Sequence, residues 1–257
     1  MLNIDLTGRI ALVLGGSRGI GAGVTESLCR AGAITTFTHT GNPNHQNRIE
    51  FLLAQLREEG GKVEAVVCNA LDSQATTAVA ADIVKRHGRL DILVANVGQN
   101  LAKPAEEVSD QQWHEFIEKN LTSAFYGVRA VLPHMLKNGF GRIILIGSSA
   151  VCDGGGGAID YAAGKAGLHG MMVYLAKNYA RKGISTNLIH PCVIETDLLR
   201  ERYGDPEKKQ QLIAQVPVGR LGKPEDITGL TAFLASAWGD FICGQAILVD
   251  GGRILFK

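Results

Sequence analysis

Two side chains that could move a proton, Tyr161 and Lys165, lie four positions apart in the segment Tyr-Ala-Ala-Gly-Lys. On a helix, positions i and i+4 share one face and lie one turn apart. A phenol has a pKa of about 10, too high for a good base near neutrality, but a neighbouring ammonium lowers it. We therefore expect Tyr161 to exchange a proton with a substrate oxygen. The same spacing also occurs on solvated helix faces, so the rest of the chain must support this interpretation.

A serine hydroxyl is expected beside this pair. Ser148 lies 13 residues before Tyr161 and directly follows an apolar run, 142–147, that predicts a strand. Sheets of parallel strands bind ligands at the carboxyl ends of the strands, so Ser148 is placed to hold the substrate oxygen beside Tyr161. Ser149 is the competing hydroxyl, and the spacing and the preceding Gly147 favour Ser148. Either serine could instead serve only as a cap.

A glycine-rich segment stands between the first predicted strand and the first predicted helix. Its candidate cofactor contacts are Gly15, Ser17, Arg18, Gly19, Ile20 and Gly21. A backbone that approaches a pyrophosphate closely needs glycine, and a helix N-terminus supplies N–H groups and partial positive charge. A tight glycine turn is the alternative, but this position in the chain favours dinucleotide binding. The spacing Gly-x-x-x-Gly-x-Gly differs from the Gly-x-Gly-x-x-Gly of long-chain dehydrogenases.

The end of the second predicted strand indicates which dinucleotide binds. Enzymes that prefer NAD usually place an acid there for the ribose 2′-OH. Here the strand ends with Thr38, His39 and Thr40. The threonine hydroxyls suit a phosphate, and the guanidinium of Arg18 matches phosphate geometry. The sequence therefore predicts NADP(H); the alternatives are a solvated Arg18 and an NAD-dependent alcohol dehydrogenase.

Short apolar runs alternate with amphipathic stretches along the chain. The predicted strands are 9–14, 33–39, 63–68, 90–95, 142–147, 185–189 and 246–249. The predicted helices are 19–30, 46–59, 73–86, 109–120 with a further helix to 136, 161–182 and 224–236, and a loop-rich section covers 193–218. Such alternation predicts βαβ units, and continuous apolar strands predict burial on both faces. We expect an α/β fold: a single Rossmann-like domain over 1–257, with a doubly wound parallel β-sheet and helices on both faces.

Composition excludes several classes of protein. The chain has 257 residues, 46% of them hydrophobic, and a net charge of +1, which fits one ordinary core and no nucleic-acid-binding stripe. No apolar run approaches the roughly 20 residues that span a bilayer, and Asp5 and Arg9 argue against a secretory signal. The five cysteines are scattered and lack zinc-ligand spacing, so we expect reduced thiols, no metal site and a cytoplasmic location.

Asn120 completes a recognisable set of residues. It lies inside a predicted helix, where Asn is a poor helix former, so either a functional role or a bend in the helix should explain it. The order Asn120, Ser148, Tyr161, Lys165, together with the glycine loop, resembles the short-chain dehydrogenase/reductase family over about 7–252. The resemblance implies that these four residues are catalytic. It also implies that Asn120 holds a water linking Lys165 to solvent, and that Lys165 hydrogen bonds the nicotinamide ribose.

The resemblance implies further cofactor contacts. These are Asn69, Ala70, Asn96, Gly98, Tyr161, Lys165, Pro191, Ile194 and Thr196. Asn96 should tie its strand end to the neighbouring segments, Gly98 should let the chain pass close to the cofactor, and Ile194 and Thr196 should meet the nicotinamide carboxamide. Asn69 could instead serve only as a turn residue.

The chain departs from the family pattern at four positions, namely Leu14, Ala95, Val97 and Cys192. The family usually has a threonine where this chain has Leu14, so we expect one hydrogen bond of the glycine turn to be missing. Cys192 replaces a glycine and should narrow the pocket or shift the nicotinamide.

The resemblance implies an NADP(H)-dependent enzyme that moves a hydride between the nicotinamide and a carbonyl or secondary alcohol. The pattern is similar to 3-oxoacyl-(acyl-carrier-protein) reductases, so a 3-oxoacyl-type ketone, free or carrier-bound, is the expected substrate, with about 193–218 as a lid. A homotetramer is also implied. The pair Arg181-Lys182 could dock an acidic carrier or only complement a helix C-terminus. The rival from another class is a catalytically idle dinucleotide-binding sensor or scaffold.

Overall fold

A parallel sheet forms the centre of the molecule. The computed structural model describes residues 4–196 and 205–254, and within them the sheet has seven strands in the order β3-β2-β1-β4-β5-β6-β7. The strands are β1 (Ile10–Leu14), β2 (Ile34–His39), β3 (Val63–Val67), β4 (Ile92–Ala95), β5 (Gly141–Ile146), β6 (Ile184–Pro191) and β7 (Ala246–Val249). Because each neighbouring pair is parallel, all these strands end at one edge of the sheet.

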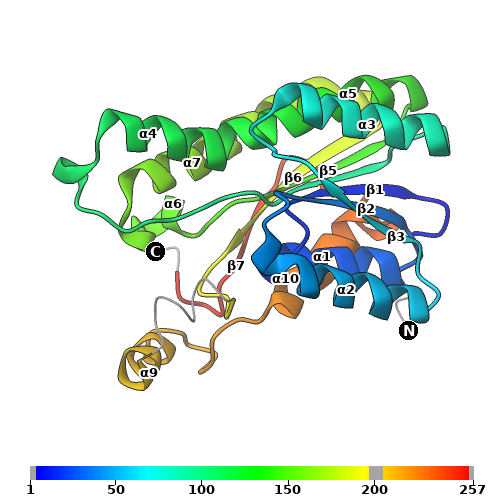
Figure 1. Ribbon diagram of the computed structural model, residues 1–257. Helices are drawn as coiled ribbons and strands as arrows, with labels where there is room; N and C mark the ends of the chain where they lie inside the picture. The colour runs from blue at the N-terminus through cyan, green and yellow to red at the C-terminus, as the bar shows by residue number, and fades with distance from the viewer. Residues whose placement is uncertain (1–3, 197–204, 255–257) are drawn as a thin grey trace.

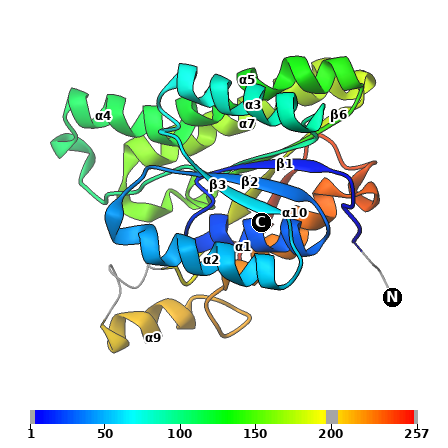
Figure 2. The same ribbon diagram turned by 45° about the vertical axis from the view of Figure 1, so that its right-hand side comes forward.

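Helices cover both faces of this sheet (Figures 1 and 2). One layer contains α1 (Gly19–Arg30), α2 (Gln46–Glu58) and α10 (Pro224–Ala235), and the other contains α3 (Ser73–His87), α5 (Ser123–Asn138) and α7 (Ile159–Tyr179). Three further helices are α4 (Asp110–Ile117), α6 (Ala150–Asp153) and α9 (Pro206–Ala214). The expected fold class, a doubly wound α/β sheet with helices on both faces, is confirmed.

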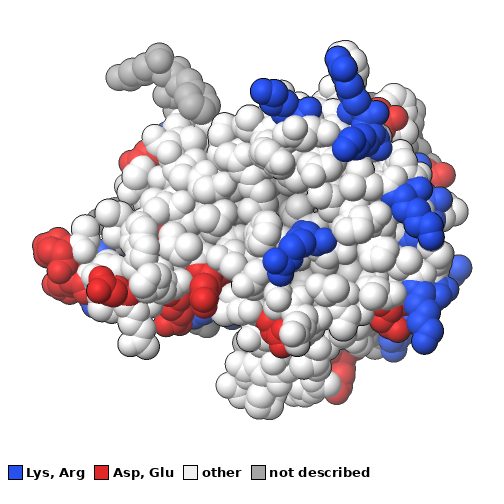
Figure 3. All heavy atoms as spheres, turned by 90° about the horizontal axis from the view of Figure 1, so that it is seen from above, with Lys and Arg blue, Asp and Glu red and all other residues white. Residues whose placement is uncertain are grey.

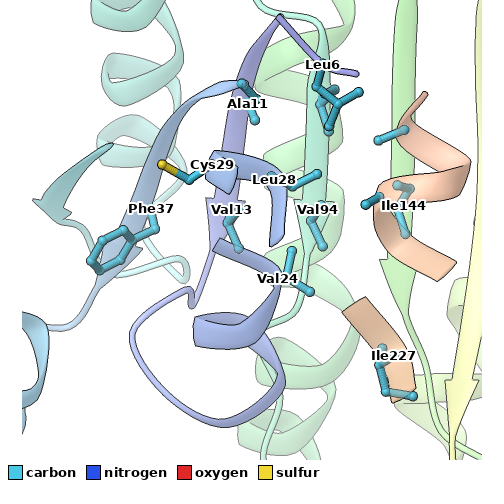
Figure 4. Packing of buried hydrophobic residues seen from close by; sticks show 14 of the residues in the cluster. Leu6, Ala11, Val13, Val24, Leu28, Cys29, Phe37, Val94, Ile144 and Ile227 are labelled. Carbon is cyan, nitrogen blue, oxygen red and sulfur yellow. The ribbon is translucent and has the colours of Figure 1, made fainter. Parts of the chain in front are cut away.

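Continuous apolar strands explain why both faces are covered. Every residue of β1, β4 and β5 is buried, and successive side chains of a strand point to opposite faces. Val13 of β1 therefore packs with Val24 and Leu28 of α1 (Figure 4), whereas its neighbour Leu12 belongs to the cluster of Val131 on the other face. One strand thus supports two hydrophobic cores.

The strand order places a crevice between β1 and β4. From β1 the chain proceeds outward to β2 and β3, then returns to β4 on the other side of β1. The loops after β1 and β4 consequently diverge toward opposite layers, and ligands bind in doubly wound sheets at this switch point. The glycine loop follows β1, so the topology brings it to this crevice.

The structure corrects the predicted elements in three segments. Within the section predicted as loop, α9 begins at Pro206, and the Asp205 carboxylate caps it by accepting the Glu207 N–H at 2.9 Å. The two helices predicted between 109 and 136 form one run, because a π-turn joins α4 to α5. The helix predicted over 161–182 begins earlier, and a 3-10 turn (Ala180–Lys182) follows its end at Tyr179.

None of the helices within 4–196 and 205–254 combines the length and apolar character needed to cross a bilayer. The five cysteines are free thiols, and three of them, Cys29, Cys68 and Cys192, are buried.

Candidate active site

Two adjoining hollows open at the carboxyl edge of the sheet. The larger, about 610 Å³, lies over the ends of β4, β5 and β6, and the smaller, about 420 Å³, over the ends of β1, β2 and β3. Both are lined by Ile20, Asn96, Gly98, Gln99 and Thr196. The two hollows therefore form one crevice across the switch point.

The crevice gathers most of the residues that the sequence indicated. Its larger hollow is lined by Ser148, Tyr161, Lys165, Pro191, Ile194 and Thr196. Its smaller hollow is lined by Gly15, Ser17, Arg18, Gly19, Ile20, Thr38, His39, Thr40, Asn69, Ala70, Asn96 and Gly98. Gly21 and Asn120 are not in these walls, and each supports residues that are.

Gly21 lies behind the glycine loop. A Cβ at this position would collide with the carbonyl oxygen of Gly15 and would lie 2.6 Å from Asn96 Nδ2. The Asn96 amide donates to that same carbonyl at 2.9 Å and so ties the end of β4 to the loop, as the sequence predicted. Only glycine leaves room where the loop, α1 and Asn96 meet.

The glycine loop is anchored to β2. The N–H of Gly15 donates to the Thr38 hydroxyl at 3.1 Å, and the N–H of Gly16 donates to the Thr38 carbonyl at 3.1 Å. Leu14 is buried in the core. The leucine side chain cannot hydrogen bond, so these two bonds to Thr38 are the ones that tie the loop to the neighbouring strand. They also give the Thr38 hydroxyl a partner within the protein, whereas the sequence suggested a phosphate.

Tyr161 and Ser148 meet in the larger hollow. β5 ends two residues before Ser148, and Tyr161 is the third residue of α7, so both side chains reach the carboxyl edge of the sheet. Burial raises the pKa of Tyr161 above its ordinary value, and a hydrogen bond to the Ser148 side chain partly offsets this rise. Ser148 Oγ also accepts the Ala150 N–H at 3.2 Å. The phenol is therefore protonated at neutral pH and shares the hollow with a hydroxyl that is held in place.

Lys165 lies one helical turn after Tyr161 and is buried. Its Nζ donates to the carbonyl oxygen of Ile146 at 2.9 Å and to that of Val97 at 3.3 Å. Burial lowers the pKa of Lys165 to about 8. The sequence predicted a lowered pKa for Tyr161 next to this ammonium. That prediction is wrong for this structure, because burial of the phenol outweighs the opposing effects.

Asn120 lies in the π-turn, Glu118–Thr122. Its side chain is 1% exposed. The Asn120 Nδ2 donates to the carbonyls of Gln99 and Phe116, each at 2.9 Å, and Oδ1 accepts the Gln99 N–H at 3.1 Å. These bonds hold the segment after β4 against the helix. A π-turn admits an extra residue and redirects side chains, which accounts for an Asn inside this helical run.

Gly98 lies between Asn120 and Lys165. A Cβ on Gly98 would be 2.8 Å from Asn120 Oδ1 and 2.8 Å from Lys165 Nζ. The sequence assigned this glycine to a close approach of the cofactor. The structure gives a further reason, because any larger residue would push the amide and the ammonium apart.

His190, near the end of β6, is a positioning group that the sequence did not indicate. Its Nδ1 accepts the Ser148 N–H at 3.0 Å, and the ring is 3% exposed. Burial lowers the pKa of His190 to about 4, so the imidazole is neutral and Nδ1 stays an acceptor. The contact joins residues 42 positions apart, so the only signal in the sequence was the place of His190 directly before Pro191, one of the predicted cofactor contacts.

The outer end of the smaller hollow faces solvent. Arg18 precedes α1 and is exposed, as is Thr40, whereas His39 is half-buried. His39 Nδ1 accepts the Gly41 N–H at 3.2 Å, and burial lowers the pKa of this imidazole. Within the described part of the chain, no Asp or Glu lines this hollow.

Asn69 has a turn bond as well as a place in the smaller hollow. Its Oδ1 accepts the Leu71 N–H at 3.1 Å. The turn role that the sequence left open is therefore present, and it is compatible with a place in the wall.

The segment after β6 is held to the loop before α10. The Glu195 N–H donates to the Gly222 carbonyl at 2.7 Å, and the Gly222 N–H donates to the Val193 carbonyl at 3.1 Å. Val193 has a φ of 48°, which is unusual for a β-branched residue. These flanking bonds fix the strained residue, so Ile194 and Thr196 line the crevice in a defined position.

Comparison with known sequences finds relatives over nearly the whole chain. A family model described as enoyl-(acyl carrier protein) reductase matches residues 15–253. The 3-oxoacyl-(acyl-carrier-protein) reductase FabG of Escherichia coli (strain K12) is 37% identical over 252 residues, covering 98% of this chain and 100% of the relative. The 2,3-dihydroxy-2,3-dihydro-p-cumate dehydrogenase of Pseudomonas putida is 32% identical and covers 98% of this chain and 96% of the relative.

Solved structures agree with these relatives. The gluconate 5-dehydrogenase of Burkholderia cenocepacia J2315, in complex with NADP and tartrate, has a TM-score of 0.90 and 31% identity, covering 98% of this chain and 97% of that chain. A dehydrogenase/reductase of Sinorhizobium meliloti 1021 has a TM-score of 0.89 and 31% identity, covering 98% of each chain. Sequence, fold and crevice thus lead to one conclusion: this chain belongs to the short-chain dehydrogenase/reductase family of oxidoreductases.

Proposed function

We propose that this chain is an NADP(H)-dependent carbonyl reductase that acts on 3-oxoacyl-type ketones, with Tyr161 as the proton donor. The observation that carries the proposal is that Tyr161 and Ser148 line one hollow, which is continuous with the hollow of the glycine loop. The name of the Escherichia coli relative, and its sequence similarity to this chain, support 3-oxoacyl groups as the substrate class.

The crevice fits a dinucleotide. Gly15 and Gly19 have positive φ values of 72° and 52°, and α1 begins at Gly19 with its N-terminus toward the smaller hollow. A loop of this kind brings backbone N–H groups to a pyrophosphate without intervening Cβ atoms. When bound, NADPH would supply the hydride that reduces the carbonyl carbon.

Tyr161 and Ser148 would act on the carbonyl oxygen. Ser148 Oγ holds that oxygen beside the phenol, and Tyr161 donates its proton as negative charge develops. The raised pKa of Tyr161 keeps the phenol protonated, which suits an acid in the direction of reduction. Lys165, with a pKa of about 8, is suited to hydrogen bond the nicotinamide ribose and to pass a proton toward Tyr161. Asn120 would hold the water that connects Lys165 to solvent.

The residues at the outer end of the smaller hollow favour NADP(H) over NAD(H). Arg18, His39 and Thr40 line the part of the smaller hollow where the 2′-phosphate would lie, and the described wall carries no acid that would repel it. A guanidinium binds phosphate through paired hydrogen bonds. Pro191, Ile194 and Thr196 would meet the nicotinamide end, while Asn69 and Ala70 would contact the adenine. The Burkholderia neighbour was solved with NADP.

A homotetramer with a cytoplasmic location belongs to the same proposal. The face formed by α3, α5 and α7 carries its charged side chains mainly toward the margins (Figure 3). On it Phe125, Val173 and Tyr174 are 44%, 46% and 61% exposed. Apolar side chains gathered on one face favour association. The exposed Arg181-Lys182 pair is available to an acidic carrier. The segment 193–218, which includes α9 and of which 197–204 lie outside the described residues, would act as the substrate lid.

NADPH oxidation with a panel of 3-oxo esters and simple ketones tests this function, with Tyr161→Phe as the decisive variant. We expect the variant to lose about 1000-fold in kcat while binding NADPH as tightly as the wild type, because only the proton donor is removed. Tyr174→Phe removes an exposed phenol from the same helix and should keep full activity. A wild type that oxidises NADPH with none of these ketones would instead support the sensor interpretation.

A further inference from the structure

A guanidinium lies in the wall of the larger hollow. Arg253 lines it together with Ser148 and Tyr161, and its side chain is 24% exposed. It belongs to the segment after β7, which runs toward α6 in Figure 1. Of the side chains that line this hollow in the described part of the chain, none is an Asp or Glu, whereas Lys165 and Arg253 are basic. The hollow is therefore suited to negative charge.

The turn that carries Arg253 is firmly built. The Asp250 carboxylate accepts the N–H of Gly252 at 2.9 Å and the N–H of Ile254 at 2.7 Å. The Gly251 carbonyl accepts the Val218 N–H at 3.1 Å. These bonds fix the backbone on both sides of Arg253, so its side chain starts from a defined position.

The guanidinium has partners in three other segments of the wall. Nη1 donates to Cys192 Sγ at 3.2 Å and Nη2 donates to Gln215 Oε1 at 3.0 Å, while Asp153 Oδ2 lies 3.7 Å from Nη1. The sulfur is a weak acceptor and the amide is uncharged, whereas the Asp153 carboxylate is a charged partner that lies beyond hydrogen-bond distance. A substrate carboxylate in place of the sulfur and the amide would form a shorter, charge-assisted and bidentate contact.

Cys192 joins this guanidinium to the reacting centre. Its sulfur accepts a hydrogen bond from Arg253, and Cys192 lines the same hollow as Tyr161. Arg253 and the phenol that would protonate the substrate oxygen therefore face one hollow. An anionic group held by Arg253 and the carbonyl that Tyr161 protonates would then belong to one substrate.

We propose that Arg253 is a specificity-determining residue that binds the carboxylate of the substrate. The preferred substrates are then short oxo acids, such as 3-oxo acids, and in the reverse direction the corresponding hydroxy acids. This inference rests on the proposed function only for the reaction itself, because the binding of the carboxylate can be measured without turnover.

The test compares acetoacetate with methyl acetoacetate, which has the same ketone and no charge. Titration calorimetry on the protein saturated with NADP⁺ measures binding, since a ketone cannot accept a hydride from the oxidised cofactor. We expect the wild type to bind acetoacetate about 10-fold more tightly than the ester. The affinity of Arg253→Gln should be about 10-fold lower than that of the wild type for the acid and less than about 2-fold lower for the ester. Arg253→Lys should recover part of the lost affinity for the acid. The ratio of kcat/KM for acid and ester, measured with NADPH, should follow the same order.

The control variant is Lys62→Gln, which removes one exposed positive charge at the opposite, amino-terminal end of β3 and should leave both affinities unchanged. If Arg253→Gln loses affinity for acid and ester equally, so that the ratio of the two affinities is unchanged, Arg253 has only a structural role and the proposal is overturned. If acetoacetate binds through Arg253 and no NADPH is oxidised, the proposed reaction fails while the carboxylate site stands. If the kcat/KM for reduction of the ester equals that for the acid, the proposed reaction stands and the carboxylate site fails.

Discussion

The two ends of the crevice are built differently. At the catalytic end, Asn120, Lys165 and His190 are each at most 3% exposed, and every one holds a hydrogen bond to a neighbouring segment. At the outer end, Arg18 and Thr40 are exposed. Because burying a polar group is costly unless it is paired, the catalytic end is part of the folded core. The outer end is part of the surface, so it can change its affinity for a cofactor without changing the fold.

The largest effect is expected at the catalytic end from Ser148→Ala. Loss of the hydroxyl removes the group that would hold the carbonyl oxygen beside Tyr161, so kcat/KM for a 3-oxo ester should fall about 100-fold. Ser149→Ala is the matched control, because Ser149 lines the same hollow one position later, and it should lose less than about 3-fold. Equal losses in the two variants would contradict the assignment of Ser148.

A second test uses the buried imidazole of His190. Its folded-state pKa of about 4 lies below the ordinary value of 6.5, so the unfolded chain binds the proton more readily. The stability that depends on the neutral ring is therefore full above pH 6.5 and is lost as the pH falls from 6.5 toward 4. Between pH 7 and pH 4.5 this amounts to about 2 kcal/mol of the free energy of unfolding.

Urea unfolding of wild type and His190→Gln at these two pH values measures the effect. The Gln variant keeps an acceptor for the Ser148 N–H and cannot be protonated, so it should lose about 2 kcal/mol less than the wild type on acidification. Identical losses would show that the ring is not held neutral by the fold.

The smallest effect is expected at the outer end. Arg18→Ala should weaken NADPH binding about 10-fold by removing a phosphate contact, and it should leave NADH binding and the melting temperature almost unchanged. Fluorescence titration with each cofactor measures both affinities. If NADPH binds the variant as tightly as the wild type, Arg18 does not contact the 2′-phosphate. The claim that the exposed outer end sets the affinity for the cofactor would then be wrong for Arg18.

The sequence predicted the parts that depend on local patterns. Continuous apolar runs such as 143–146 bury on both faces wherever a parallel sheet forms, so the strands and the layers followed from the pattern of apolar residues. The glycine loop, Ser148, Tyr161 and Lys165 reach one crevice because each directly follows a strand or lies near the start of a helix at the same sheet edge.

Contacts between distant residues could not be predicted. The bond from Gly15 to the Thr38 hydroxyl spans 23 positions, and the contact between Cys192 and Arg253 spans 61. No local pattern encodes such pairs. The same limit explains the pKa of Tyr161, because helical spacing indicates a neighbouring ammonium but not how deeply the phenol is buried. The helix α9 was missed because its nine residues are mostly polar and only Leu212 is buried.

Transfer of deuterium from NADPH that carries deuterium at both positions of the nicotinamide C4 tests the central claim most directly. After a single turnover with methyl acetoacetate, mass spectrometry should find one deuterium on carbon 3 of the hydroxy ester, and Tyr161→Phe should form that product about 1000-fold more slowly. A product without deuterium, or a variant that transfers it at the wild-type rate, would contradict hydride transfer with protonation by Tyr161.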